Sequence, residues 1–321
     1  MDYSKIIIPS SLHPDTILAI FLLKKFGGKK YPGIGGAEIE IRQVLAENDT
    51  PVSLKEKGVI CLDVGQGEFD HHADKEGKIL SELVARDLEI ATDPALAKLL
   101  AYAARDDKFG MGTISTDQLD RAFGLSGLIS SINKTVQVPE KILQILFPVL
   151  EAHYLEERKR TTELPLEFEK NAKEGKAEVT EVKHKDKKLK VVFLESDNVS
   201  MPGWIKSSAG LKADVVCMRT SPGYTNILTK QQKMIDLRWL AAHVRHEESE
   251  LKGENITYSA EILMSEGNIS EIPEWYYDRA TNSLLNGGTN PKGIQPTRIP
   301  LARIKTIVVD ALSKDIPRYG N

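Results

Sequence analysis

Short apolar runs alternate with helical patterns along the first half of the chain. The runs KIIIP, EIEIR and VICLDV have the length and composition of buried strands. Apolar residues at helical spacing predict helices over Thr16–Phe26 and Ile79–Ile90, and Pro94 after Asp93 predicts the start of another. Gly27–Gly28 closes the first helix, because glycine adopts the left-handed conformation that ends many helices. Strands that alternate with helices predict a parallel sheet covered by helices.

A helical block to about residue 173 leads into a second α/β region. AEVTEV and KLKVVFLES predict a hairpin, and ADVVCMRT and TNILT predict two further strands. Helical patterns return in Trp204–Gly210, Ile235–Leu251 and Leu301–Leu312. We therefore expect an α/β fold with a doubly wound, mostly parallel sheet and a second, smaller α/β domain. The expected boundaries are residues 1–150 for the first domain, 151–175 for a helical connector and 176–321 for the second domain.

Composition places the chain among ordinary globular proteins. Its 321 residues are 41% hydrophobic and 28% charged, which excludes disordered and fibrous classes. Cys61 and Cys217 lie inside apolar runs, so a disulfide scaffold is excluded and reduced core thiols are expected. The longest apolar run, Ile17–Leu23, is too short to span a bilayer. We expect a cytosolic protein with no membrane partner.

The charge balance limits the kind of partner. The chain has 43 Lys and Arg residues against 46 Asp and Glu residues, whereas proteins that bind phosphate backbones non-specifically carry a basic excess. Any contact with nucleic acid must therefore be local. Lysine-rich spots such as Lys183–Lys190 lack interleaved aromatic residues, and the pattern is typical of solvated turns and helix ends.

Acidic and imidazole side chains gather where the predicted strands and helices of the first domain end. His13 and Asp15 follow the first strand, and Asp63 follows the third. In open α/β sheets the loops at the carboxyl ends of strands converge on ligands. Carboxylates and imidazoles together suit Mn²⁺, Mg²⁺ or Zn²⁺, the ions with which phosphoester hydrolases activate water. The remaining members of the set are Asp70, His71, His72, Asp106 and Asp107.

Each piece except one also has a purely structural interpretation. Asp15 fits a helix N-cap, Asp63 fits a turn after a strand, and Asp106–Asp107 fits a solvated helix end. The tripeptide Asp70–His72 has no common structural role, because two adjacent histidines follow an acid only seven residues after a strand-end aspartate. It therefore indicates a metal site more specifically than the others.

The segment VICLDVGQGEFDHH resembles the DVG and DHH motifs of DHH-type phosphoesterases. Within that superfamily the chain is most similar to metal-dependent hydrolases of the melanocyte-proliferating-gene type. Those proteins also have an early H-x-D, matched by His13 and Asp15, and a D-x-x-D-N-G segment, approximated by Ala104–Gly110. The resemblance covers residues 1 to about 110, with the DHH segment as its specific part.

The resemblance implies a Mn²⁺ (or Mg²⁺) site of one or two ions and a C-terminal domain that closes over substrate. Relatives cleave phosphodiesters in nucleotides, cyclic dinucleotides, oligonucleotides or RNA ends. Asp63 would bridge the ions, His72 would lie near the scissile phosphate, and Asp70 would orient a histidine. The full set of metal ligands carried over is His13, Asp15, Asp63, His71 and Asp107.

The sequence also departs from the family pattern. A further histidine of the melanocyte-type motif is replaced by Ile8, the glutamate after the early aspartate is Thr16, and the asparagine after Asp107 is Lys108. These replacements predict a poorer metal site. An alternative function is therefore a nucleotide or nucleic-acid binding module that keeps the fold without full activity.

The second domain offers a candidate substrate contact. DHH-type enzymes commonly bind substrate with a glycine-rich turn, and Asn286, Gly287 and Gly288 form such a segment here. This signal is weak, because a plain turn without a ligand also explains it. Arg298 is the preferred phosphate contact. Thr289, Asn290 and Lys292 lie in the sequence between Gly288 and Arg298. Trp275–Tyr277 is either core or a base-stacking platform.

Other catalytic templates are missing from the sequence. It has no G-x-S-x-G elbow, no Walker A segment, no G-x-G-x-x-G at a strand-to-helix turn and no C-x-x-C. The leading hypothesis is therefore a metal-dependent phosphodiesterase or exonuclease acting on a nucleotide, oligonucleotide or RNA. The binding module is second, and a small-molecule phosphatase or pyrophosphatase is third. Whether the chain forms a homodimer stays open.

Overall fold

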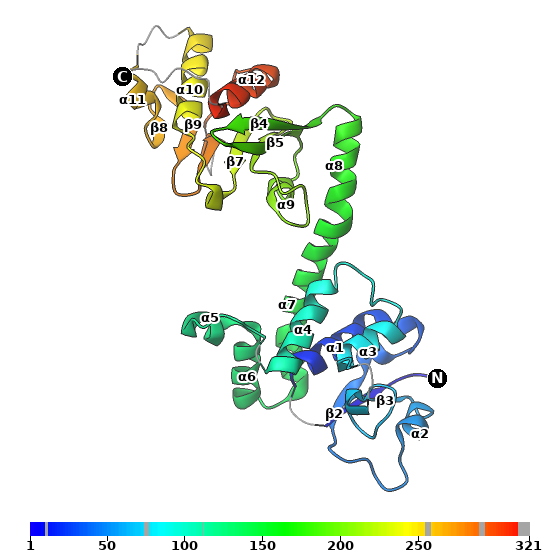
Figure 1. Cartoon of the computed structure of the whole chain (residues 1–321). Helices are drawn as coiled ribbons and strands as arrows, with labels where there is room; N and C mark the ends of the chain where they lie inside the picture. Colours follow the sequence, from blue (N-terminus) through cyan, green and yellow to red (C-terminus); the bar gives the residue numbers. More distant parts are fainter. Residues whose placement is uncertain (10–11, 74–76, 111, 254–257, 289–292, 314–321) are drawn as a thin grey trace. The chain divides into compact units, whose positions relative to one another are not determined.

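The computed structural model describes residues 1–9, 12–73, 77–110, 112–253, 258–288 and 293–313. The chain forms two compact units, Met1–Lys159 and Arg160–Asn321 (Figure 1). A π-helical turn over Lys159–Glu163 contains the boundary between them. Each unit combines helices with one sheet, so the α/β class is confirmed, and the larger sheet belongs to the second unit.

The first unit is built around a short parallel sheet. Its strand order is β2-β1-β3, and its three parallel strands lie in the apolar runs that predicted strands. The strands are β1 (Lys5–Ile8), β2 (Glu38–Ile41) and β3 (Val59–Cys61). The helices are α1 (Pro14–Phe26), α2 (Pro51–Lys55), α3 (Leu80–Asp87), α4 (Ala97–Phe109), α5 (Gln118–Phe123), α6 (Leu125–Thr135) and α7 (Pro139–Arg158). Short 3₁₀ turns occupy Gly27–Lys29, Ile34–Gly36 and His71–Ala73.

Side chains of β1 alternate between two cores. Ile6 and Ile8 pack against the buried face of α1, while Ile7 packs with Leu54 and Cys61 on the other side of the sheet. Successive strand residues point to opposite faces, so an unbroken apolar run is needed where both faces are covered. Helix α1 is itself buried along most of its length, which explains its almost wholly apolar sequence.

Two predicted helix boundaries in this unit differ from the structure. Gly27 ends α1 with φ −74°, so the left-handed conformation predicted for it is wrong. A Cβ at Gly27 would lie 3.2 Å from Ile34 Cγ2, so close packing accounts for the glycine. The helix predicted from Pro94 begins at Ala97, because Pro94 belongs to a turn in which Asp93 Oδ1 accepts from Ala95 N at 2.9 Å.

The second unit contains a seven-stranded, mostly antiparallel sheet of order β4-β5-β6-β7-β10-β9-β8. The predicted hairpin and its two following strands are present. The strands are β4 (Ala177–His184), β5 (Lys187–Glu195), β6 (Val215–Arg219), β7 (Thr225–Thr229), β8 (Gly267–Ile269), β9 (Ile272–Asp278) and β10 (Ser283–Asn286). The helices are α8 (Leu164–Lys173), α9 (Met201–Lys206), α10 (Arg238–Lys252), α11 (Ala260–Leu263) and α12 (Leu301–Leu312), and Gln231–Lys233 is a 3₁₀ turn.

Helices cover both faces of this sheet (Figure 1). Val191 and Phe193 of β5 point into a core shared with α10 and α12. Val192 and Leu194 point to the opposite face, against α8 and α9. Both faces are therefore buried, which accounts for the continuous apolar sequence of β5.

Strands β8, β9 and β10 were not predicted. They are short, and β9 contains Pro273 and Glu274 within IPEWYYD, so no clear alternation marks it. Trp275 and Tyr277 are buried in the core of this unit, which decides against a stacking platform for these two rings. Both cysteines are buried and unpaired, as predicted. Within the described residues, no helix is long and apolar enough to cross a membrane.

Candidate metal centre

The loop that follows β3 folds back on itself. Asp63 and Gln66 have φ values of 52° and 56°, in the left-handed region that non-glycine residues rarely adopt. Gly65 has φ 79°, and a Cβ there would lie 2.9 Å from Pro51 Cγ. Asp63 N donates to Phe69 O at 2.9 Å, which closes the loop. Backbone strain of this kind is concentrated at functional sites, and here it brings residues 70–72 next to Asp63.

Asp63 and His71 form the shortest contact of the site. Asp63 Oδ1 lies 2.7 Å from His71 Nδ1 and accepts from His71 N at 3.3 Å. Both contacts use Oδ1, and Asp63 Oδ2 makes no hydrogen bond within the described part of the chain. Burial raises the pKa of Asp63, and the contacts with His71 offset this rise only in part.

The other ring nitrogen of His71 faces a second carboxylate. His71 Nε2 lies 3.8 Å from Oδ1 of Asp107, which projects from α4. Burial lowers the pKa of His71, but the hydrogen bond with Asp63 and the charges of Asp63, Asp107 and Asp15 raise it further, so the net change is upward. His71 therefore lies between two acids from different parts of the sequence.

Asp70 and His72 form a second pair beside the first. Asp70 Oδ1 accepts from His72 N at 3.2 Å and lies 3.0 Å from His72 Nδ1. Asp70 Oδ2 accepts from Gln66 N at 2.9 Å, so this buried carboxylate also holds the loop. The His72 side chain is 70% exposed, and its ring stacks on that of His71 with centroids 4.4 Å apart.

Asp15 caps a helix other than its own. Its Oδ2 and Oδ1 accept from Leu80 N and Ser81 N, each at 2.9 Å, at the start of α3. The residue preceding α3 is Ile79, whose apolar side chain cannot cap, so Asp15 supplies the missing acceptors. The pKa of Asp15 is raised to about 6, because burial and the charge of Asp107 raise it more than the contacts with Ser81 and Leu80 lower it.

The predicted ligands are thus brought together only in part. Asp63, His71 and His72 can each place one donor atom within 4.8 Å of the others. Asp15 and Asp107 act on His71 through their charges. His13 is exposed at the start of α1 without a side-chain cap hydrogen bond, and it lies outside the group that meets the 4.8 Å limit among the described residues.

Asp106 differs from its neighbour Asp107. Its Oδ1 accepts from Gly112 N at 2.8 Å and from Ser126 Oγ at 2.5 Å, so it fixes the chain beyond α4. Asp107 is left to face His71. Of these two neighbouring aspartates, the resemblance assigns a ligand role to Asp107, and this role stays a prediction.

The donor set fits a divalent ion. Imidazole nitrogen and carboxylate oxygen are ligands of Mn²⁺, Mg²⁺ and Zn²⁺ in proteins. Two donors that each lie about 2.1 Å from one ion are at most about 4.2 Å apart. The separation of 3.8 Å between His71 Nε2 and Asp107 Oδ1 falls within that limit.

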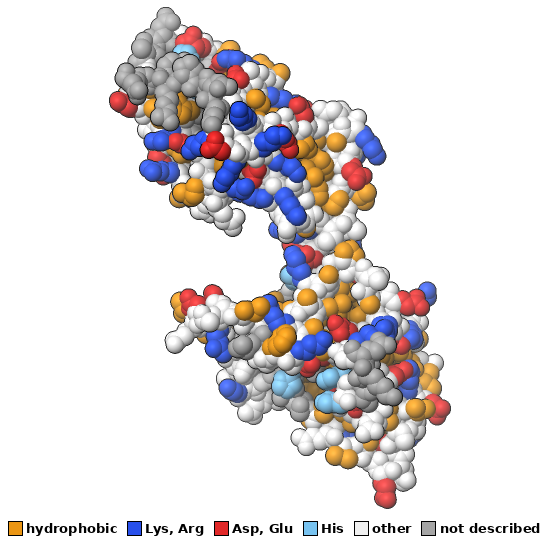
Figure 2. Space-filling view, in the orientation of Figure 1, with side chains coloured by type: hydrophobic (Ala, Val, Ile, Leu, Met, Phe, Trp, Pro, Cys, Tyr) orange, Lys and Arg blue, Asp and Glu red, His pale blue; other side chains and the backbone are white. Residues whose placement is uncertain are grey.

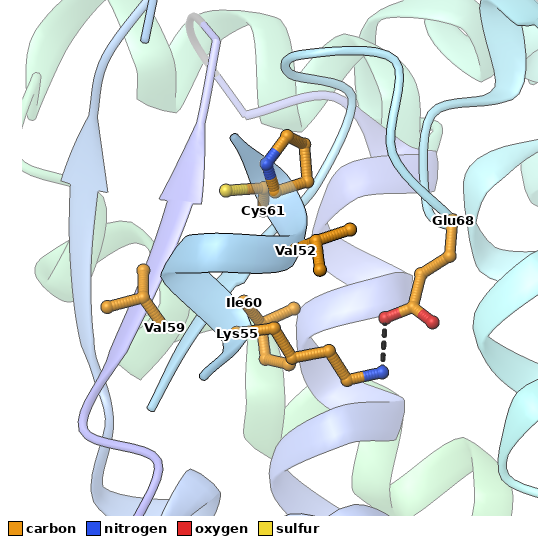
Figure 3. Close-up of a pocket in the computed structure, with 7 residues that line it drawn as sticks. Val52, Lys55, Val59, Ile60, Cys61 and Glu68 are labelled. Atoms are coloured by element: carbon orange, nitrogen blue, oxygen red, sulfur yellow. Dashed lines mark hydrogen bonds and ion pairs between the residues drawn. The ribbon is translucent and has the colours of Figure 1, made fainter. Parts of the chain in front are cut away.

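A cavity of about 270 Å³ lies beside β3 but does not contain these groups (Figure 3). Apolar residues of α2 and β3 make most of its wall. Lys55 and Glu68 also line it and form an ion pair, with 2.5 Å between Nζ and Oε1. Asp63, His71 and His72 are not among its lining residues. The cavity is therefore separate from the candidate metal centre.

The predicted glycine-rich turn of the second unit is held by its asparagine. Asn286 Nδ2 donates to Glu274 O at 2.9 Å and to Gln295 O at 3.3 Å, and Oδ1 accepts from Thr297 N at 2.8 Å and Thr225 N at 3.3 Å. The amide of Asn286 is thus fully used by backbone groups. Gly287 and Gly288 have φ values of 81° and 76°, which only glycine adopts easily. The predicted contacts Thr289, Asn290 and Lys292 lie outside the described residues.

Arg298 is exposed, and a residue that sequence reasoning missed fixes its backbone. Glu248 of α10 is fully buried, and its Oε1 accepts from Arg298 N at 2.8 Å. Its Oε2 accepts from Trp275 Nε1 at 3.0 Å and from Thr297 Oγ1. The only sequence signal was an acid one helical turn after Arg245, which is equally buried in the structure.

Comparisons with known proteins give weak likenesses. No protein-family model and no curated protein matches the sequence. The chain is similar to PggH, a pGpG-specific phosphodiesterase from Vibrio cholerae, with 9% identity, a TM-score of 0.23, and coverage of 76% of this chain and 89% of that one. It is also similar to the DHH domain of a member of a family of ribosomal proteins, with 11% identity, a TM-score of 0.29, and coverage of 97% of this chain and 87% of that one.

Proposed function

We propose that the chain is a metal-dependent phosphodiester hydrolase of the DHH type that acts on a nucleotide, oligonucleotide or RNA. One observation carries this proposal: His71 lies between Asp63 and Asp107, with one carboxylate on each ring nitrogen. A histidine held in this way presents one nitrogen to a metal ion while the other is fixed by its partner.

The proposed ligands of one ion are His71 Nε2 and Asp107. Asp63 holds the opposite side of the His71 ring through Oδ1, so its Oδ2 is left for a second ion. When His71 donates Nδ1–H to Asp63 Oδ1, its Nε2 carries the lone pair that a metal ion requires. His13 and Asp15 complete the ligand set that the resemblance assigns. A bound Mn²⁺ or Mg²⁺ would lower the pKa of a water and neutralise charge on the phosphate.

The chain's own residues would handle the substrate and the proton. Hydrolysis adds the hydroxyl of water to phosphorus, breaks one P–O bond and passes a proton to the departing oxygen. Asp70 holds His72 through Nδ1, which leaves Nε2 of this exposed ring to contact the phosphate or donate that proton. In the second unit, Arg298 retains guanidinium donors for phosphate, while Asn286, Gly287 and Gly288 shape the turn.

A second candidate function is a binding module with one ion or none. Both carboxylate oxygens of Asp15 already accept amides of α3, so this predicted ligand is partly committed to the fold. Ile8 and Thr16 supply no ligand at the positions where relatives of the melanocyte type have one. These features favour a site with weak metal affinity.

Metal titration and hydrolysis separate the two candidates. Mn²⁺ binding is measured by calorimetry, and turnover is measured on a labelled oligoribonucleotide and an aryl phosphodiester, with and without chelator. We expect Asp63→Asn and His71→Gln to lower Mn²⁺ affinity at least tenfold and to abolish turnover. Asp120→Asn, an exposed acid on α5, is the control that leaves both unchanged. Metal binding without turnover would select the binding module, and turnover that survives both variants would refute the site.

A further inference from the structure

Strand ends in the second unit bring basic residues together that are far apart in sequence. The pairing of the sheet places the β4–β5 turn, the start of β6, the end of β7 and the β9–β10 turn at one end. We call the basic side chains at this end the cationic row: Lys183, Lys185, Lys187, Lys188, Lys190, Lys212, Lys230, Lys233, Arg238 and Arg279. Figure 2 shows Lys and Arg side chains gathered over this unit.

The cationic row carries a local positive charge that the whole chain does not have. Its ten cations lie with five acids, Glu181, Asp186, Asp214, Asp236 and Asp278, which leaves a net charge of +5 by subtraction. The complete chain has a net charge of −3.

Only some of these cations form ion pairs among the described residues. Lys188 pairs with Glu181 at 2.9 Å, Lys233 with Asp214 at 3.5 Å, and Arg238 with Asp236 at 2.6 Å. In the described ranges, no ion pair involves Lys183, Lys185, Lys187 or Arg279. All four are exposed.

The hairpin register places two lysines against each other. Lys183 lies directly opposite Lys188, and His184 lies opposite Lys187. Like charges on directly opposed strand positions destabilise a hairpin, so an external anion would relieve the repulsion. The hairpin lysines surround an open hollow of about 600 Å³, and a second hollow of about 460 Å³ holds Arg238 and Arg279.

We propose that the cationic row binds the phosphate backbone of a nucleic acid strand. From β4 to β9 the row crosses five strand spacings, about 24 Å at about 4.8 Å each. A stacked strand carries one phosphate about every 3.4 Å, so the row matches about seven phosphates. A linear polymer fits a narrow row. A membrane-binding surface would present several large apolar side chains, whereas among the described residues that line the two hollows Met234 is the exposed large apolar one.

The surface is distinct from the proposed substrate contacts. Asn286 ends β10 and pairs beside Trp275, at the other end of the strands from Ser283 and Asp278. Few aromatic side chains are exposed in the row, so binding depends on charge and not on base identity. The inference goes beyond the proposed hydrolase function and does not require the metal centre, because binding is tested without metal.

The test is fluorescence anisotropy of labelled oligo(dT) of 3, 7 and 15 nucleotides with the full chain in excess chelator. We expect affinity to rise steeply from 3 to 7 nucleotides and little beyond. The net charge of +5 can neutralise about five of these seven phosphates. The logarithm of affinity should therefore fall with the logarithm of salt with a slope of about −3.5, or roughly 100-fold between 50 and 200 mM. The triple variant Lys183→Gln, Lys187→Gln and Arg279→Gln should reduce this slope by about 2.

The matched control removes three exposed lysines elsewhere, in Lys57→Gln, Lys170→Gln and Lys176→Gln. It should keep the slope of the unmodified chain. Absence of binding to any oligonucleotide, or equal losses in both triple variants, would overturn the proposal. Sedimentation with vesicles containing 30% anionic lipid is the third arm, and vesicle binding without oligonucleotide binding would assign the surface to a membrane instead. Circular dichroism verifies that both variants are folded.

Discussion

Glu248 offers a sharp test of how the second unit is held together. Its carboxylate, with no exposed surface, accepts from Trp275 Nε1, Thr297 Oγ1 and Arg298 N. In Glu248→Gln, the side-chain nitrogen must face at least one of these donors, because only one oxygen remains. A buried donor left without an acceptor costs about 1–3 kcal/mol, so we expect the free energy of unfolding to fall by about 2 kcal/mol.

Tryptophan fluorescence makes the assay specific to this unit. The chain has three tryptophans, Trp204, Trp239 and Trp275, and all belong to the second unit. With a urea m-value of about 2 kcal/mol per M, a loss of 2 kcal/mol lowers the unfolding midpoint by about 1 M. Glu248→Leu, which removes all three acceptor contacts, should lower the free energy of unfolding by about 4 kcal/mol.

The neighbouring residue provides the control. Glu247 pairs with Arg303 at 2.7 Å on the surface, where both side chains are partly exposed. Exposed pairs contribute about 0–1 kcal/mol, so Glu247→Gln should shift the midpoint by less than about 0.5 M. Equal shifts for Glu247→Gln and Glu248→Gln would refute the buried network as the anchor of Thr297 and Arg298.

Three further outcomes follow from the described contacts. Gly65→Ala forces a side chain into a backbone of φ 79° against Pro51, and should destabilise the loop by about 1–3 kcal/mol, measured as faster hydrogen exchange over residues 63–72. The pKa of Asp15 is raised from 3.8 to about 6, mainly by burial, so between these pH values the folded state of the metal-free protein binds a proton that the unfolded state has lost. The free energy of unfolding of the first unit should therefore fall by about 3 kcal/mol as pH rises from about 4 to 6. Asp15→Asn should remove this pH dependence, measured by hydrogen exchange at a series of pH values. Burial also raises the thiol pKa of Cys61 to about 11 and of Cys217 to about 12. Native protein at pH 8 should therefore react with a disulfide reagent roughly 100-fold more slowly than urea-unfolded protein. Equal rates would contradict the burial of both thiols.

Local pattern accounts for the parts of the fold that the sequence predicted. The apolar runs of β1 and β3, the β4–β5 hairpin and the closing helix Leu301–Leu312 all carry a period or a length that one kind of element satisfies. Strand β9 was missed because Pro273 and Glu274 interrupt its pattern, and its identity as a strand depends on pairing with β8 and β10. Pairing is a property of the folded chain, since both partners lie elsewhere in the sequence.

The candidate site divides in the same way. The sequence alone determined that Asp63 follows a strand and that Asp70, His71 and His72 come within a short loop after it, because these spacings are local. Only the tertiary structure decided that Asp107 faces His71, because the packing of α4 sets that distance, and that Asp15 caps α3. The cationic row likewise required strand order and register, which place separate lysines at one end of a sheet. Electrostatic interactions depend on distance in space, and contacts between residues far apart in the chain exist only after folding.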